Sequence, residues 1–185
     1  MPDTFSYRHA RDLGVSKRQL YRWRDEGALE VVGRGLYRRA DASPADLDLL
    51  EIAHRAPEAT LCLTSALVQH DLSDAIPATH DVAVPRGQRT PIVAAPVTWH
   101  RFDPATFDVG RESLRLDDET EIGLYNAPRS IVDAFRLATD QGPELGNEAL
   151  RRWLRAGGRP AEILETGTHF PRVLSRLRAA MEVLL

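Results

Sequence analysis

Basic and aromatic side chains recur at helical spacing near the start of the sequence, in the stretch SKRQLYRW of residues 16–23. Lys17, Arg18, Tyr21 and Arg22 project from one side of a helix in this register, because residues three or four positions apart share a face. An arginine in such a place can bind guanine through two parallel hydrogen bonds. The chemistry that these residues predict is nucleic-acid binding.

A β-hairpin is predicted directly after this helix. Two short runs of β-prone residues, at 31–32 and 36–37, flank Gly33-Arg34-Gly35, which is a hairpin signal. Arg34 at the tip is free to approach a phosphate or the minor groove. A helix followed by such a hairpin is the layout of a winged helix-turn-helix, whose helix enters the major groove. The residues expected to contact DNA are Ser16, Lys17, Arg18, Gln19, Tyr21, Arg22, Arg34 and Arg38.

Several local signals predict how the basic helix is held. Ser16 is a suitable N-cap, and Gly27 a suitable C-terminal stop. Leu20 and Trp23 lie three residues apart on the side opposite the basic one, so we expect both to be buried against Leu13, Val15 and the wing.

A first helix of the pair is predicted over residues 6–14, where Tyr7, Ala10 and Leu13 have helical spacing. Gly14-Val15-Ser16 then makes the tight turn between the paired helices. The alternative is that residues 16–39 form only a small amphipathic helix beside a surface hairpin.

Charge is divided unevenly along the chain. Residues 1–40 carry nine Lys and Arg against five Asp and Glu, a net charge of +4, whereas the whole chain carries −3. The remainder therefore carries −7. Lys17 is the only lysine, so the abundance of arginine is a bias of the whole chain and the argument depends on where the arginines lie. A basic N-terminal region on an acidic body indicates nucleic-acid binding through one end.

The rest of the chain predicts a mixed α/β domain with a helical tail. Residues 40–46 form a break with a proline and no apolar periodicity, so we place the boundary there, between domains of residues 1–40 and 45–185. Apolar periodicity predicts helices and alternation predicts strands. The expected helices are 46–55, 60–70, 131–138, 145–154, 161–166 and 170–185, and the expected strands are 81–85, 96–102, 112–116 and 121–125. The fold class is α+β.

Other residues capable of chemistry form no convincing site. The histidines are His9, His54, His70, His80, His100 and His169. None pairs with another at the spacing that zinc sites use, so we expect no metal. Ser65, His70 and Asp71 could be drawn as a catalytic triad, but Ser65 lacks the glycines of a nucleophile elbow.

A nuclease is the more serious catalytic alternative. The commonest such core needs a lysine beside its acids, and no lysine follows residue 40. We therefore expect no catalysis and no cofactor. Pro85-Arg86-Gly87 with Arg89 forms a basic turn that either contacts phosphate or only closes a strand.

Composition indicates a cytoplasmic protein. The sequence shows no signal peptide, and its longest nearly uncharged apolar run, residues 59–68, is shorter than a membrane-spanning helix. Cys62 is the only cysteine, which excludes an intrachain disulfide. Its leucine neighbours favour a buried structural thiol.

Four ordered segments resemble the AbiEi-type antitoxins. They are GVSKRQLYRWRDEGALEVVGRGLYRRAD (residues 14–41), LCLTSALVQHDLSDAIP (61–77), VAVPRGQRTP (82–91) and APRSIVDAFR (127–136). The resemblance implies a transcriptional autorepressor that is also an antitoxin. Its partners would be double-stranded operator DNA, bound by one chain or by a homodimer, and a nucleotidyltransferase-like toxin encoded next door. In some members neutralisation occurs without stable contact between the two.

One departure from the family concerns the N-terminus. Only about five residues precede Ser6, so the first helix usual in a winged-helix unit is shortened or missing. We therefore expect the small N-terminal core to lean on the C-terminal domain. The alternative function is a protein-interaction module that does not bind DNA, whose basic helix docks on an acidic partner such as the toxin and neutralises it by direct contact.

Overall fold

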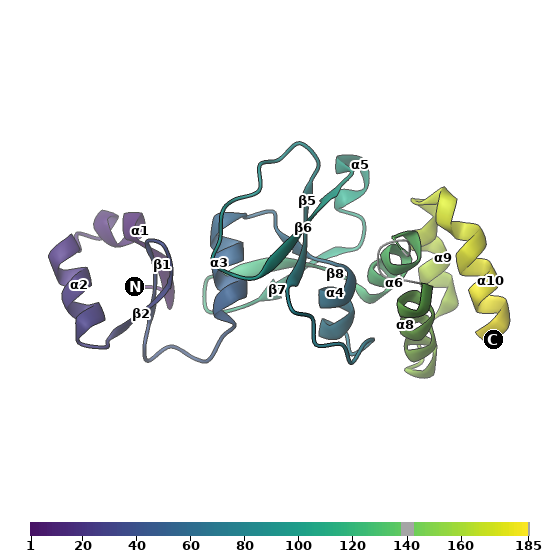
Figure 1. Ribbon diagram of the computed structural model, residues 1–185, viewed down its shortest axis with the longest axis horizontal. Helices are drawn as coiled ribbons and strands as arrows, with labels where there is room; N and C mark the ends of the chain where they lie inside the picture. Colours follow the sequence, from purple (N-terminus) through teal and green to yellow (C-terminus); the bar gives the residue numbers. More distant parts are fainter. Residues whose placement is uncertain (138–142, 185) are drawn as a thin grey trace. The chain divides into compact units, whose positions relative to one another are not determined.

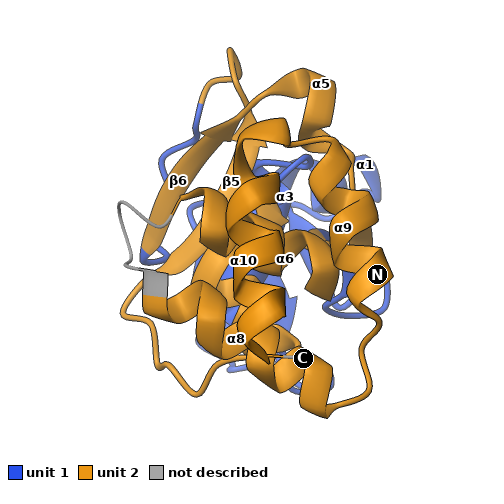
Figure 2. Cartoon of the chain, turned by 90° about the vertical axis from the view of Figure 1, so that its right-hand side faces the viewer, with its two compact units in different colours: residues 1–59, 90–96, 113–122 blue, residues 60–89, 97–112, 123–185 orange. Residues whose placement is uncertain are grey.

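The computed structural model describes residues 1–137 and 143–184, which form α+β structure in two compact units. Unit 1 comprises residues 1–59, 90–96 and 113–122, and unit 2 comprises residues 60–89, 97–112 and 123–185 (Figure 2). The predicted fold class is confirmed: a helix-turn-helix-like region precedes an α/β region and a helical tail. No helix of the described residues is long and apolar enough to span a membrane.

The first part of the chain pairs two short helices with a three-stranded sheet. Strand order is β1-β3-β2, with both neighbouring pairs antiparallel. A register irregularity between Val31 and Gly33 marks the hairpin. The elements are β1 (Thr4–Ser6), α1 (Tyr7–Asp12), α2 (Lys17–Asp25), β2 (Leu29–Gly33), β3 (Leu36–Arg39) and α3 (Leu47–Arg55).

A five-stranded mixed sheet follows, in the order β6-β5-β4-β8-β7. Strand β4 lies at its centre, antiparallel to β5 and parallel to β8, while β5 and β6 are parallel. The strands are β4 (Thr60–Leu61), β5 (His80–Pro85), β6 (Val97–Phe102), β7 (Arg111–Arg115) and β8 (Glu121–Tyr125). Two helices lie between strands in the sequence, α4 (Leu63–Gln69) and α5 (Pro104–Phe107). The helices after the last strand are α6 (Ala127–Arg136), α8 (Pro143–Arg155), α9 (Pro160–Thr168), η1 (Pro171–Val173) and α10 (Leu174–Leu184) (Figure 1).

The core of unit 2 surrounds helix α6, which is buried from Ala127 to Phe135. Asn126 caps this helix by accepting a hydrogen bond from the Arg129 amide, and its proline lies in the first turn, where no intrahelical donor is lost. Helices α4, α8, α9 and α10 all pack on α6. This packing buries the polar residues Arg129, Ser130 and Asp133 of α6 together with its apolar ones.

One ion pair is enclosed in this core. The side chains of Arg129 and Asp133 are both fully buried, with Nε of Arg129 2.9 Å from the Asp133 carboxylate. Arg129 also donates to the carbonyl oxygens of Thr106 and Val109, and its guanidinium lies 4.2 Å from the centre of the Tyr125 ring. These contacts compensate for the loss of hydration that a buried charge suffers.

The largest error in the predicted elements is at residues 60–70. Residues Thr60–Leu61 are strand β4, and only from Leu63 does the segment become helical. A short apolar run does not distinguish a buried strand from a helix, and here pairing with β5 and β8 decides. The short elements β1 and α5 were not predicted. Ala138 and Leu185, the ends of two predicted helices, lie outside the described residues.

The expected domain boundary at residues 40–46 differs from the division between the compact units. Helix α3 belongs with the N-terminal sheet because Gly33 closely approaches Glu51: a Cβ atom at Gly33 would lie 2.5 Å from Oε1 of Glu51. The buried Glu51 carboxylate in turn accepts hydrogen bonds from the amides of Ala94 and Ala95. That residues 1–40 act as a separate DNA-binding domain stays a prediction.

Candidate nucleic-acid interface

The basic helix α2 begins with a complete capping box. The Ser16 hydroxyl accepts a hydrogen bond from the Gln19 amide (3.2 Å), and the Gln19 side-chain oxygen accepts one from the Ser16 amide (3.0 Å). This reciprocal pair satisfies two backbone donors at the helix start. Ser16 and Gln19, both expected to contact DNA, are exposed but have this structural role as well.

The inner side of α2 packs on a small apolar cluster. Leu20 is fully buried, as predicted, together with Phe5, Ala10, Leu29 and Tyr37. Trp23 is half-buried against the same cluster. The prediction for Leu13 was wrong: its side chain is 55% exposed, because helix α1 ends at Asp12 and Leu13 forms its C-cap outside the cluster.

The outer side of α2 gathers the predicted cations. Lys17, Arg18, Tyr21 and Arg22 are all exposed and line one shallow hollow along the helix. The Tyr21 ring lies between two cations, with Nζ of Lys17 5.4 Å and the guanidinium carbon of Arg24 4.8 Å from its centre. Such contacts hold the ring and orient both cations. Arg24 was not predicted as part of this face.

The two central arginines of α2 differ in their surroundings. Arg22 lies 3.7 Å from Glu26 in an exposed pair, which contributes only about 0.3–0.5 kcal/mol and is easily exchanged for a stronger acceptor. Arg18 forms no hydrogen bond or ion pair with any residue that the structure describes. Both guanidinium groups are therefore available to an incoming anion.

Arg34 lies at the tip of the β2–β3 hairpin, as the sequence predicts. It is exposed, and the following Gly35 has a φ of +69°, a conformation that glycine adopts without strain. The Arg55 guanidinium donates to the Arg34 carbonyl oxygen and so connects the tip to helix α3. The tip is fixed while the Arg34 side chain stays exposed.

The prediction that Arg38 contacts DNA is corrected by the structure, because its side chain is buried. Its side chain is only 4% exposed and its Nη1 lies 3.1 Å from the carboxylate of Asp117, whose side chain is 2% exposed. Nη1 also donates to the Thr4 hydroxyl at 2.9 Å, and Nη2 donates to the Ser43 carbonyl oxygen. Strand β1 lies beside β3 with Thr4 opposite Arg38, so this side chain meets protein rather than solvent.

Asp117 is placed for this role by its own turn. Oδ1 accepts hydrogen bonds from the amides of Glu119 and Thr120, and Oδ2 accepts one from the Thr4 hydroxyl at 2.6 Å. Burial by itself would raise the pKa of Asp117, but these hydrogen bonds outweigh it and hold the pKa below its ordinary value. This contact joins the N-terminal sheet to the turn at Asp117, which belongs to the same compact unit, so the expectation that the N-terminal core leans on the C-terminal domain stays a prediction.

Two of the three residues considered for a catalytic triad form hydrogen bonds within the fold, and neither bonds the other. The buried Ser65 hydroxyl accepts a hydrogen bond from the Asp81 amide at 2.8 Å. Nε2 of His70 lies 2.8 Å from the Tyr125 carbonyl oxygen rather than from Ser65.

Cys62 is fully buried, as expected, and burial raises the pKa of its thiol well above the ordinary value.

The fold and this surface define a helix-turn-helix protein whose exposed basic helix stands beside a hairpin. Residues 2–40 match the family model described as "Transcriptional regulator, AbiEi antitoxin". The match confirms the resemblance to the AbiEi antitoxins over residues 2–40, and the resembling segments at 61–77, 82–91 and 127–136 lie outside it.

Solved structures add a likeness in fold. The crystal structure of the RV2827C protein from Mycobacterium tuberculosis superposes with a TM-score of 0.55 at 16% sequence identity, covering 98% of this chain and 76% of that one. At this identity the likeness extends to the fold alone. No curated protein matches the sequence.

Proposed function

We propose that the chain binds its own promoter DNA as an autorepressor and counteracts an adjacent nucleotidyltransferase-like toxin. The observation that carries the proposal is the outer face of α2, where exposed cations stand on a rigid, capped helix inside the segment that matches the regulator family. The excess of positive charge in residues 1–40 over an acidic remainder supports the same use.

In the proposed complex, α2 lies in the major groove and the hairpin lies along the backbone. Arg18 and Arg22 are the candidates for reading bases, because they are four residues apart and point away from the buried Leu20. Lys17 and Arg34 are candidates for phosphate contacts. Ser16, Gln19 and Tyr21 complete the proposed surface, and Arg38 is no longer part of it.

The body of the chain supplies the antitoxin activity in this proposal and performs no catalysis. The protein acts in the cytoplasm, and two copies bind the operator as a homodimer. In this proposal, repression uses the residues of α2, whereas neutralisation of the toxin by binding uses residues outside α2.

The test replaces Arg18 and Arg22 by alanine. Each bidentate contact to guanine is worth about 1–3 kcal/mol, so the double variant should lose roughly 2–6 kcal/mol of operator affinity if the two contributions add. Neither side chain is buried, and alanine favours the helix, so thermal stability should not fall. Affinity for the upstream promoter fragment is measured at two salt concentrations, because phosphate contacts weaken steeply with salt.

A matched control is Arg151→Ala with Arg155→Ala on α8. These arginines are also exposed and four residues apart, so the control removes the same charge with the same spacing in unit 2. The control should repress normally. The α2 variant, expressed from an independent promoter, should fail to repress but still rescue cells from the toxin.

Loss of both activities in a folded, abundant α2 variant would refute this assignment. The alternative, an interaction module whose basic helix docks on an acidic partner, would then explain the data.

A further inference from the structure

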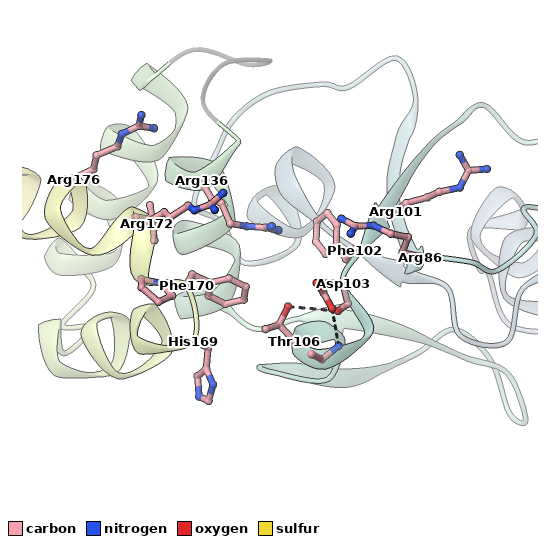
Figure 3. A pocket seen from close by; sticks show the side chains of 13 residues that line it. Arg86, Arg101, Phe102, Asp103, Thr106, Arg136, His169, Phe170, Arg172 and Arg176 are labelled. Atoms are coloured by element: carbon pink, nitrogen blue, oxygen red, sulfur yellow. Dashed lines mark hydrogen bonds between the residues drawn. The ribbon is translucent and has the colours of Figure 1, made fainter.

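Unit 2 contains a second concentration of arginine, which shares no residue with α2. A pocket of about 660 Å³ opens between the end of the β5–β6 pair and the segment that joins α9 to α10 (Figure 3). Asp103 is the only carboxylate among the lining residues, and its Oδ1 already caps helix α5 by accepting a hydrogen bond from the Ala105 amide. Five arginines line the pocket: Arg86, Arg101, Arg136, Arg172 and Arg176.

Four of these arginines have no partner among the residues that the structure describes. Arg86, Arg101, Arg172 and Arg176 are exposed and form no ion pair or hydrogen bond through their side chains with residues 1–137 or 143–184. Figure 3 shows Arg86 pointing into the pocket from the strand side, while Arg136 and Arg172 extend from the helical side. The side chains of Arg101 and Arg176 extend away from it. Like charges gathered in this way repel one another unless an anion lies between them.

The fifth arginine is held in place by the core. Asp133, which is fully buried, accepts a hydrogen bond from Nε of Arg136 at 3.0 Å. The Arg136 guanidinium also lies between two aromatic rings, 4.8 Å from the centre of Phe102 and 5.1 Å from that of Phe170. A guanidinium fixed in this way loses little conformational entropy when it binds a phosphate.

The chemistry and size of the pocket indicate its ligand. Planar guanidinium groups pair with phosphate oxygens through two parallel hydrogen bonds, and several around one cavity suit more than one phosphate. The volume falls in the range of small-molecule sites, about 300–1,000 Å³, and the pocket is concave, unlike the extended face that a duplex requires. Phe102 and Phe170 add an apolar wall.

We propose that this pocket binds a small polyphosphate, of the size of a nucleoside triphosphate. The basic turn at residues 85–89 then has a role beyond closing a strand, because its Arg86 faces the phosphates. This site shares no residue with the proposed DNA interface, since all its lining residues belong to unit 2 and those of the interface belong to unit 1.

The test is calorimetric titration of the full chain with ATP and, separately, with inorganic tripolyphosphate at low salt. Saturable binding of one ligand per chain is expected. Arg86→Gln with Arg172→Gln should weaken it about tenfold or more, because each substitution removes a charge-assisted hydrogen bond to a phosphate. Neither side chain is buried, so the thermal midpoint should be unchanged.

The control variant, Arg89→Gln with Arg178→Gln, removes the same charge from the same turn and from helix α10 without touching the pocket lining. It should bind within about twofold of the unmodified chain. Tighter binding of ATP than of tripolyphosphate would assign the nucleoside to the apolar wall, and equal binding would assign the site to the phosphate chain alone. Either result supports the proposal.

Three results would overturn it: no saturable binding of either probe at millimolar concentration, equal loss in the two variants, or release of bound ATP by operator duplex at equal concentration. The last would make the pocket part of a nucleic-acid surface.

Discussion

Arg38 offers the sharpest test of how the basic N-terminal region is built. The sequence places this arginine among the DNA contacts, whereas the structure encloses it with Asp117. Arg38→Met keeps most of the apolar length of the side chain but removes the guanidinium. The Asp117 carboxylate then keeps the Thr4 hydroxyl and its own turn amides but loses its buried cation.

The expected cost follows from this burial. Breaking a buried ion pair by removing one partner typically costs about 3–5 kcal/mol, because a charge is left uncompensated. A whole domain is commonly stable by only about 5–15 kcal/mol, so the change is a large fraction of the total. Urea unfolding followed by tryptophan fluorescence, to which Trp23 in unit 1 contributes, measures the free energy of unfolding.

The double variant Arg38→Met with Asp117→Leu isolates the interaction energy between the two side chains from what each contributes through its other neighbours. Since no charge remains buried, the double variant should be less destabilised than the sum of the two single variants, by about 0.5–3 kcal/mol. If it folds, it should bind the operator as the unmodified chain does. An Arg38→Met chain of normal stability that has lost operator affinity would refute the reasoning and restore Arg38 as a DNA contact.

Four further predictions concern Arg34, the acid titration of Asp117, Cys62 and Asp133. Arg34→Ala should weaken binding to all duplexes similarly and reduce the salt slope by about 1 in a salt titration; a loss confined to one base position would show that the tip reads sequence. The depressed pKa of Asp117 stabilises the fold above the ordinary carboxyl value of about 4, and this contribution is lost as the pH falls through the lower folded value. The midpoint of Asp117→Asn should therefore vary less between pH 2 and about 5, and an unchanged acid profile would contradict this. Cys62, whose thiol pKa is raised by burial, should resist iodoacetamide at about pH 8 until urea unfolds the chain, and rapid labelling of the folded protein would show that it is accessible. Asp133→Ala should cost about 3–5 kcal/mol in urea unfolding, since Arg129 would lose its buried partner; a cost under about 1 kcal/mol would show that the carbonyl contacts of Arg129 suffice.

The sequence predicted most accurately the features that form within one short segment. Ser16 caps α2 and Gly33-Arg34-Gly35 turns the hairpin, because capping and turn geometry depend on residues only a few positions apart. The exposed cations of α2 were predicted for the same reason: helical periodicity places them opposite Leu20. Strand β1 was missed, since three residues carry too little pattern to be recognised.

The arrangement of distant residues was decided only by the tertiary structure. Arg38 and Asp117 are 79 residues apart, and no spacing in the sequence indicates that they meet. The pocket arginines likewise come from a turn, a strand end and three helical segments that meet only in the folded chain. Residue type determines what a side chain can do chemically, but its solvent exposure and its partner depend on which distant segments pack against it. For this reason the sequence could identify the basic helix, whereas the enclosed Arg38 and the arginine pocket required the folded chain.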